Sequence, residues 1–63
     1  MDDINIQLSA KFYIHQYGVD ASVHAAKQAD VMLARGDLDG FNVWMRIRRA
    51  IEDTQAKEGG TTL

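Results

Sequence analysis

The sequence predicts an all-α protein, a single domain with helices over about residues 4–17, 21–35 and 38–57. Proline is absent from the 63 residues, so no side chain interrupts a helix from within. Apolar residues recur at spacings of three and four, which is the helical period. Glycine and aspartate occur together in two short segments, 18–20 and 35–37, where they indicate the end of one helix and the start of the next.

The first predicted helix begins beside Asp2 and Asp3, whose charges complement the positive N-terminal end of a helix. Its predicted inner face follows the spacing i, i+4, i+7, i+8 and i+11. These positions are Ile6, Ala10, Tyr13, Ile14 and Tyr17. Leu8 and Phe12 lie on a flank of this face. The first residues also alternate as a short strand would, but the chain offers no second strand to pair with them.

The second predicted helix follows Gly18, which suits the left-handed backbone conformation after a helix end. Asp20 is the candidate N-cap, and the helix runs from Ala21 to about Arg35. Its inner face is rich in small side chains, so a neighbouring helix can approach closely. The residues of this face are Ser22, Ala25, Ala26, Ala29, Met32 and Leu33.

The third predicted helix, residues 38–57, is separated from the second by a three-residue junction. Arg35 favours the negative end of the second helix, Gly36 suits the first position beyond it, and Asp37 is the next N-cap. The stripe predicted to face inward comprises Gly40, Val43, Trp44, Ile47, Ala50, Ile51 and Thr54.

The short connections make consecutive helices neighbours in space. We therefore expect the second and third helices to form an antiparallel hairpin that the first helix crosses. Gly40 costs a helix about 0.8–1.0 kcal/mol relative to alanine, and a close approach of its backbone to Ala26 and Ala29 would explain it. The domain is expected to span 1–57, with a flexible tail over 58–63. The predicted core is Ala26, Ala29, Leu33, Trp44, Ile47 and Ile51.

Composition limits the functions open to the chain. Cysteine is absent, which excludes disulfides, thiolate metal sites and thiol catalysis. The net charge of −2 gives no overall attraction to nucleic acid or anionic lipid. No apolar run approaches the roughly 20 residues of a membrane span, and the start of the chain, Met1-Asp2-Asp3, is acidic where a signal peptide is basic. We therefore expect a cytoplasmic protein that makes no membrane contact.

Few residues offer catalytic or metal chemistry. Ser9, Ser22, His15 and His24 are the only serines and histidines, and neither serine has the flanking glycines of a nucleophile elbow. Asp20 and His24 are four residues apart, but this spacing matches no established ligand pattern. We predict no enzymatic activity, no cofactor and no metal site.

The sequence holds more apolar residues than one core of three short helices can bury. Leu38, Phe41 and Met45 lie at i, i+3 and i+7 on a flank of the third helix, away from Ile47 and Ile51. A wide core stripe is one way to place them, and contact with another chain is the other. A domain this small draws only roughly 3–5 kcal/mol from its core. We predict a protein–protein interaction module that uses Leu38, Phe41 and Met45 to form a homo-oligomer, most simply a dimer, or to bind another protein.

A small nucleic-acid-associated regulator is the second hypothesis. Two helices joined by a short glycine-containing turn have the outline of a helix-turn-helix. Arg46, Arg48 and Arg49 cluster on the third helix and would contact the nucleic acid. Base contacts come mainly from the N-terminal part of a recognition helix. Here that part, residues 38–41, is apolar and acidic, and two acidic residues follow the arginines, so nucleic acid is the weaker expectation.

The second half of the chain carries a pattern of small, acidic and apolar residues. It comprises His24-Ala25-Ala26, Asp30, Leu33, Gly36-Asp37, Gly40, Trp44, Ile47 and Ala50-Ile51. Through this pattern, roughly residues 18–55 resemble a family of short proteobacterial proteins of unknown function, and the resemblance extends weakly into the first helix. It implies an all-helical cytoplasmic protein and implies no activity.

Overall fold

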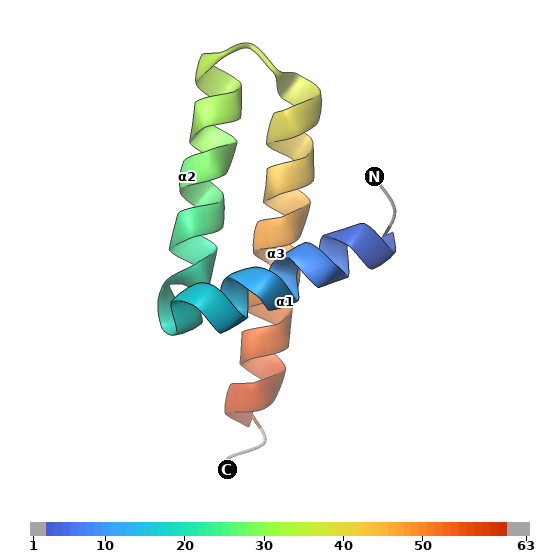
Figure 1. Cartoon of the computed structure of the whole chain (residues 1–63), viewed down its shortest axis with the longest axis vertical. Helices are drawn as coiled ribbons and strands as arrows, with labels where there is room; N and C mark the ends of the chain where they lie inside the picture. Colours follow the sequence, from blue (N-terminus) through green and yellow to red (C-terminus); the bar gives the residue numbers. More distant parts are fainter. Residues whose placement is uncertain (1–2, 61–63) are drawn as a thin grey trace.

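The structure, a computed structural model, describes residues 3–60 and is helical throughout except at one turn. Its elements are helix α1 (Asp3–Tyr17), the 3₁₀ turn η1 (Gly18–Asp20), helix α2 (Ala21–Ala34) and helix α3 (Leu38–Gly60). No strand occurs within this described part, which confirms the predicted all-α class. Helices α2 and α3 lie side by side as an antiparallel hairpin, and α1 lies across it (Figure 1).

The helical backbone continues through the first predicted linker. Gly18 takes a left-handed φ of 58°, and η1 follows without a break. Asp20 makes no side-chain cap hydrogen bond, so its predicted capping role is wrong. The 3₁₀ turn leads straight into α2, and the carbonyl oxygen of Gly18 already accepts the N–H of Ala21. Residues 3–34 are therefore one helical segment with a sharp bend, instead of two helices with a loop between them.

The junction between α2 and α3 has the geometry predicted from the sequence. Gly36 has a φ of 76°, a conformation that glycine adopts without steric cost. Its N–H donates to the carbonyl of Leu33 at 3.0 Å, and the N–H of Asp37 donates to the carbonyl of Met32 at 2.9 Å. This pair of hydrogen bonds is the Schellman motif, which satisfies the last carbonyls of a helix.

Asp37 caps the N-terminus of α3. Its Oδ1 accepts the backbone N–H of Gly40 at 2.8 Å. A Cβ on Gly40 would lie 2.7 Å from Asp37 Oδ2 and 2.8 Å from Met32 Sδ, both closer than real side chains allow. Gly40 therefore makes room for the capping carboxylate and Met32, and the predicted approach to Ala26 and Ala29 is not the reason for the glycine.

Replacing Asp37 with alanine is expected to lower the free energy of unfolding by about 1 kcal/mol. The substitution leaves the Gly40 N–H without its side-chain acceptor. Urea denaturation followed by circular dichroism measures the loss. Asparagine also offers an acceptor oxygen, so Asp37→Asn should keep most of the stability. An equal loss in both variants would contradict the capping role.

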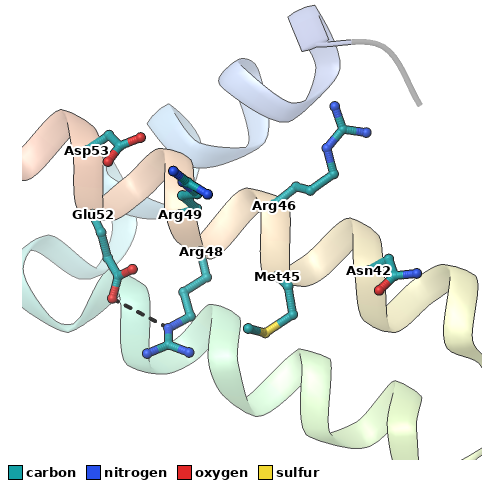
Figure 2. Close-up of a pocket in the computed structure, with 7 residues that line it drawn as sticks. All are labelled: Asn42, Met45, Arg46, Arg48, Arg49, Glu52 and Asp53. Carbon is teal, nitrogen blue, oxygen red and sulfur yellow. Dashed lines mark ion pairs between the residues drawn. The ribbon is translucent and has the colours of Figure 1, made fainter.

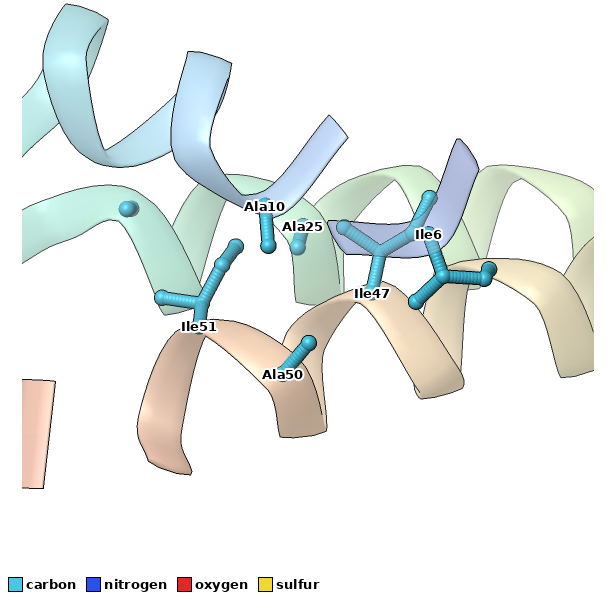
Figure 3. Close-up of a cluster of buried hydrophobic side chains, with 7 residues drawn as sticks. Ile6, Ala10, Ala25, Ile47, Ala50 and Ile51 are labelled. Carbon is cyan, nitrogen blue, oxygen red and sulfur yellow. The ribbon is translucent and has the colours of Figure 1, made fainter. Parts of the chain in front are cut away.

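The core lies where α1 crosses the hairpin (Figure 3). Its buried members are Ile6, Ala10, Ala21, Ala25, Ile47, Ala50 and Ile51. Tyr13, Ile14, Val43 and Trp44 are partly buried and pack against this cluster. Ala10, Ala21 and Ala25 are fully buried and carry only a methyl group, which lets the helix backbones approach closely.

The predicted core differs from the observed one on α2. Ala29 is buried, but Ala26 is only half-buried and Leu33 is 51% exposed, so Leu33 is not a core residue. The buried positions of α2 are instead Ala21, Ala25 and Ala29, spaced by four. The reason is the position of α1, which crosses near the start of α2 and leaves the hairpin turn uncovered (Figure 1).

The bend between α1 and α2 is held from two sides. Gln55 of α3 donates a hydrogen bond from Nε2 to the carbonyl oxygen of Gly18 at 2.7 Å. The ring of Tyr17 stacks on His24, with centroids 3.8 Å apart and planes 19° apart. The ring of Tyr13 lies edge-on to that of Tyr17, with the two ring centroids 5.3 Å apart. Burial is the main cause, and the charge of Tyr17 the second, that raises the pKa of Tyr13 above its ordinary value of 10.0. The bend is therefore fixed by contacts that the sequence did not reveal.

The two ends of the domain depart from the predicted boundaries. Helix α3 continues to Gly60, three residues beyond its predicted end at about residue 57. The flexible tail expected over 58–63 stays a prediction. Residues 61–63 and Asp2, which was expected to complement the first helix, lie outside the described residues.

Candidate association surface

Helix α1 carries apolar side chains on two opposite faces. Ile6 and Ala10 point into the core and are buried. Ile4, Leu8 and Phe12 lie on the other side and are 71%, 59% and 59% exposed. An apolar helix face is normally packed against another element. The hairpin covers only one face of α1, so the other lacks a partner within the chain.

Ile4, Leu8 and Phe12 form one continuous surface, here called the outer stripe. The residues are four apart, so neighbouring Cβ atoms are about 5–6 Å from each other, and the stripe is about 12 Å long. Its rim consists of exposed polar side chains, namely Asn5, Lys11, His15 and Gln16. An apolar patch with a polar rim is typical of a protein–protein contact.

The other exposed apolar residues are more scattered. Val19, Val23, Val31, Leu33 and Leu38 lie on the bend, on α2 and at the start of α3. Within the described parts of α2 and α3, no three exposed large apolar side chains follow one another at one-turn spacing. Single exposed apolar side chains are ordinary on a protein surface. The outer stripe is therefore the better candidate for a binding surface.

The residues predicted for association are only partly available. Leu38 is 62% exposed, whereas Phe41 and Met45 are half-buried. In Figure 2, Met45 extends from α3 to the side on which α2 is drawn. The sequence prediction placed Leu8 and Phe12 on a flank of the inner face and assigned Ile4, the start of the first helix, to no face. The spacing of four between these residues was the signal that could have identified the stripe.

The three arginines of the nucleic-acid hypothesis lie on the outer side of α3, but they diverge. Residues two apart in a helix do not face each other, and Arg46 and Arg48 extend in opposite directions in Figure 2. Arg48 Nε lies 3.5 Å from Glu52 Oε2, an exposed ion pair. The side chains border an open depression of about 650 Å³. It is lined by Asn42, Met45, Arg46, Arg48, Arg49, Glu52 and Asp53, a set of mixed charge.

The residues considered for catalysis and metal binding do not converge. Ser9 and Ser22 are half-buried, His15 is exposed, and His24 stacks on Tyr17. In the part of the chain that the structure describes, no group of three or more His, Asp or Glu side chains is placed to hold a metal ion. The arrangement assigns no chemical role to these residues.

Comparison with known proteins gave no match to a family model, to a curated protein or to a solved structure. The resemblance to short proteobacterial proteins therefore stays a prediction. Among the described helices, none combines the length and the apolar character that crossing a membrane requires.

Proposed function

We propose that this protein is a non-catalytic protein–protein interaction module and that the outer stripe of α1 is its contact surface. The observation that supports this most strongly is the double-sided apolar character of α1. The inner face with Ile6 and Ala10 is buried, while Ile4, Leu8 and Phe12 face solvent. The proposal keeps the class of function expected from the sequence and moves the surface from α3 to α1.

The energy available from the stripe indicates a weak contact. Full burial of an Ile, Leu or Phe side chain stabilises by roughly 1.5–3 kcal/mol. The three side chains are 59–71% exposed, so each still has about 1–2 kcal/mol to gain. Association itself costs about 4 kcal/mol or more. An equal apolar surface on the partner would bring the total gain to about 6–12 kcal/mol. We therefore expect a dissociation constant no tighter than the micromolar range, where about 1 μM corresponds to 8.2 kcal/mol.

A photoreactive amino acid at position 8 is expected to form adducts of discrete mass when the producing cells are irradiated. Position 8 lies at the centre of the stripe, and Lys27, which is exposed on α2, is the matched control position. Phe12→Glu in the same chain should abolish the adducts, because it places a charge in the contact. Denaturing gel electrophoresis and mass spectrometry detect them. Absence of adducts at position 8, or equal adducts at position 27, contradicts the proposal.

The nucleic-acid hypothesis receives less support from the arrangement of charges. Arg46 and Arg48 diverge, and Arg48 is paired with Glu52. The first turn of α3 carries Asp39, which repels phosphate. Binding to phosphate backbones needs a basic surface, and the outer side of α3 does not provide one.

A further inference from the structure

We propose that Gly18 is a hinge on which α1 swings out and exchanges between two copies of this chain. Helices α1 and α2 meet without a loop, because only the three residues of η1 separate them. Among the described residues 3–34, Gly18 alone has a positive φ, whereas Tyr17 before it and Ala21 beyond η1 lie in the right-handed helical region. The chain has no proline to forbid a straight helix here. Rotation at Gly18 to a helical φ, with small adjustments in η1, therefore joins α1 and α2 into one helix.

The contacts that hold the bend are exposed to solvent. Residues 17–20 include no buried side chain. The hydrogen bond from Gln55 Nε2 to the Gly18 carbonyl is exposed, and in a straight helix the same carbonyl accepts the N–H of Ser22, four residues on. The bend also has the stack of Tyr17 on His24 to lose. Opening the hinge therefore breaks few contacts at the hinge itself.

The buried inner face of α1 selects a second copy as the partner in this exchange. Opening exposes Ile6 and Ala10 on α1 and Ile51 on the hairpin, all of which are buried in the closed form. The site vacated on one hairpin is the site that its own α1 fits, so the α1 of a second copy restores the contacts between α1 and the hairpin. Short hinges favour exchange of this kind. The outer stripe takes no part in it, so the inference goes beyond the proposed function and does not rest on it.

The arrangement of the helices allows the exchange to be mutual. In the closed form α1 lies across the hairpin of α2 and α3 (Figure 1). Once straightened, α1 continues the axis of its own α2, so two hairpins that cross in the same way bring each α1 onto the other copy. A twofold axis beside the two hinges relates the copies, and both inner faces are covered. The straight helix over residues 3–34 is about 48 Å long, which exceeds the 42 Å length of the closed molecule.

Gly18→Ala is expected to turn the monomer into this dimer. A Cβ at Gly18 meets no atom within 4 Å, so the change acts on the backbone alone. Alanine disfavours the left-handed φ and favours the helix, which shifts each hinge toward the straight form about 10- to 100-fold. Within one chain, α1 meets the hairpin at an effective concentration on the order of 1 mM. The unmodified protein should therefore dimerise near about 1 mM and Gly18→Ala, with two hinges shifted, at about 10 μM or below. Sedimentation equilibrium follows the mass from 7.1 kDa toward twice that value.

Nuclear magnetic resonance distinguishes an exchanged α1 from any other dimer. Tyr13 on α1 and Trp44 on α3 have ring centroids 5.5 Å apart, close enough for a nuclear Overhauser effect. Gly18→Ala chains with and without isotope labels are unfolded together and refolded. In the exchanged dimer, an isotope-filtered spectrum shows the effect between Tyr13 of one chain and Trp44 of the other. An effect confined to single chains overturns the proposal, as does a Gly18→Ala protein that stays at 7.1 kDa up to about 1 mM.

Gly36→Ala is the matched control for backbone strain. Gly36 also has a positive φ, 76°, and an added Cβ there also meets no atom within 4 Å. Straightening at Gly36 would break the hydrogen bond from the Asp37 N–H to the Met32 carbonyl and would part α2 from α3 along their length. This variant should lose stability and stay at 7.1 kDa at about 10 μM. If it dimerises as strongly as Gly18→Ala, loss of stability drives association and the hinge proposal fails.

Two further variants cover a Gly18→Ala chain that fails to fold and an association through the outer stripe. Gln55→Ala adds no strain and removes a hydrogen bond of the bent form, so the dissociation constant of the dimer should fall about tenfold. An unchanged constant contradicts the hinge. Phe12→Glu should abolish the adducts expected at the outer stripe but leave the Gly18→Ala dimer intact. If Phe12→Glu dissociates that dimer, the outer stripe makes the contact, and the hinge proposal is wrong while the proposed function stands.

Discussion

Replacing Ile51 with alanine is expected to leave a large part of the protein unfolded at 25 °C. Ile51 is 0% exposed and is the largest fully buried side chain in the described part of the chain. Truncating a buried isoleucine to alanine costs roughly 2–5 kcal/mol, because it loses apolar burial and leaves a cavity. A domain of this size has only roughly 3–5 kcal/mol to lose. Urea denaturation followed by far-ultraviolet circular dichroism measures the effect.

Leu33→Ala is the matched control for Ile51→Ala. It removes an aliphatic side chain of the same size from a position that is 51% exposed. Because little burial is lost, the free energy of unfolding should fall by less than about 1 kcal/mol. The sequence pattern placed Leu33 in the core beside Ile51, so the two variants also separate the predicted core from the observed one. Equal losses would show that Leu33 is a core residue after all.

Replacing Ala25 with leucine is expected to lower the free energy of unfolding by about 1–3 kcal/mol. Ala25 is 0% exposed and belongs to the same buried cluster as Ala10, and both carry only a methyl group (Figure 3). Three additional carbon atoms can be accommodated only if α1 moves away from the hairpin. Urea denaturation measures the loss, and the fluorescence of Trp44, which packs against the same cluster, reports the displacement.

Ala34→Leu is the control for Ala25→Leu. Ala34 ends the same helix but is exposed. Leucine and alanine have similar helix propensities, so the free energy of unfolding should change by less than about 0.5 kcal/mol. A similar loss at both positions would mean that leucine disturbs α2 itself, and the close packing at Ala25 would no longer explain the result.

Residue types alone predicted the junction between α2 and α3 correctly, but the same reasoning gave a wrong prediction for the junction between α1 and α2. At Gly36 and Asp37, the hydrogen bonds that end α2 and begin α3 involve neighbours in sequence, so residue types suffice to predict them. Gly18 and Asp20 present a similar pair of residues. There the path is decided by a distant contact, the hydrogen bond from Gln55 to Gly18. Sequence spacing carries no information about that contact.

The rotation of each helix about its axis was harder to predict than its boundaries. Ala25 and Ala26 are equally small, so the pattern does not show which of them faces the core, although they point 100° apart. The same ambiguity affected α1, because Ile6 and Leu8 are both apolar and lie on opposite sides of the helix. The prediction therefore placed Leu8 and Phe12 on a flank of the inner face instead of on the opposite side of the helix. Only the crossing geometry distinguishes a covered apolar face from an uncovered one.

The spacing of contacts along the chain sets an order for folding. The contacts between α2 and α3 near their three-residue turn join residues that are close in sequence, whereas Gln55 and Gly18 are 37 residues apart. Closing a longer loop costs more entropy, so we expect the hairpin to assemble first and α1 to dock onto it. Helix α1, which we propose also makes the external contact, is then the last helix to dock during folding and the first to separate from the hairpin during unfolding. Anything that binds its outer side in the folded protein would slow that release.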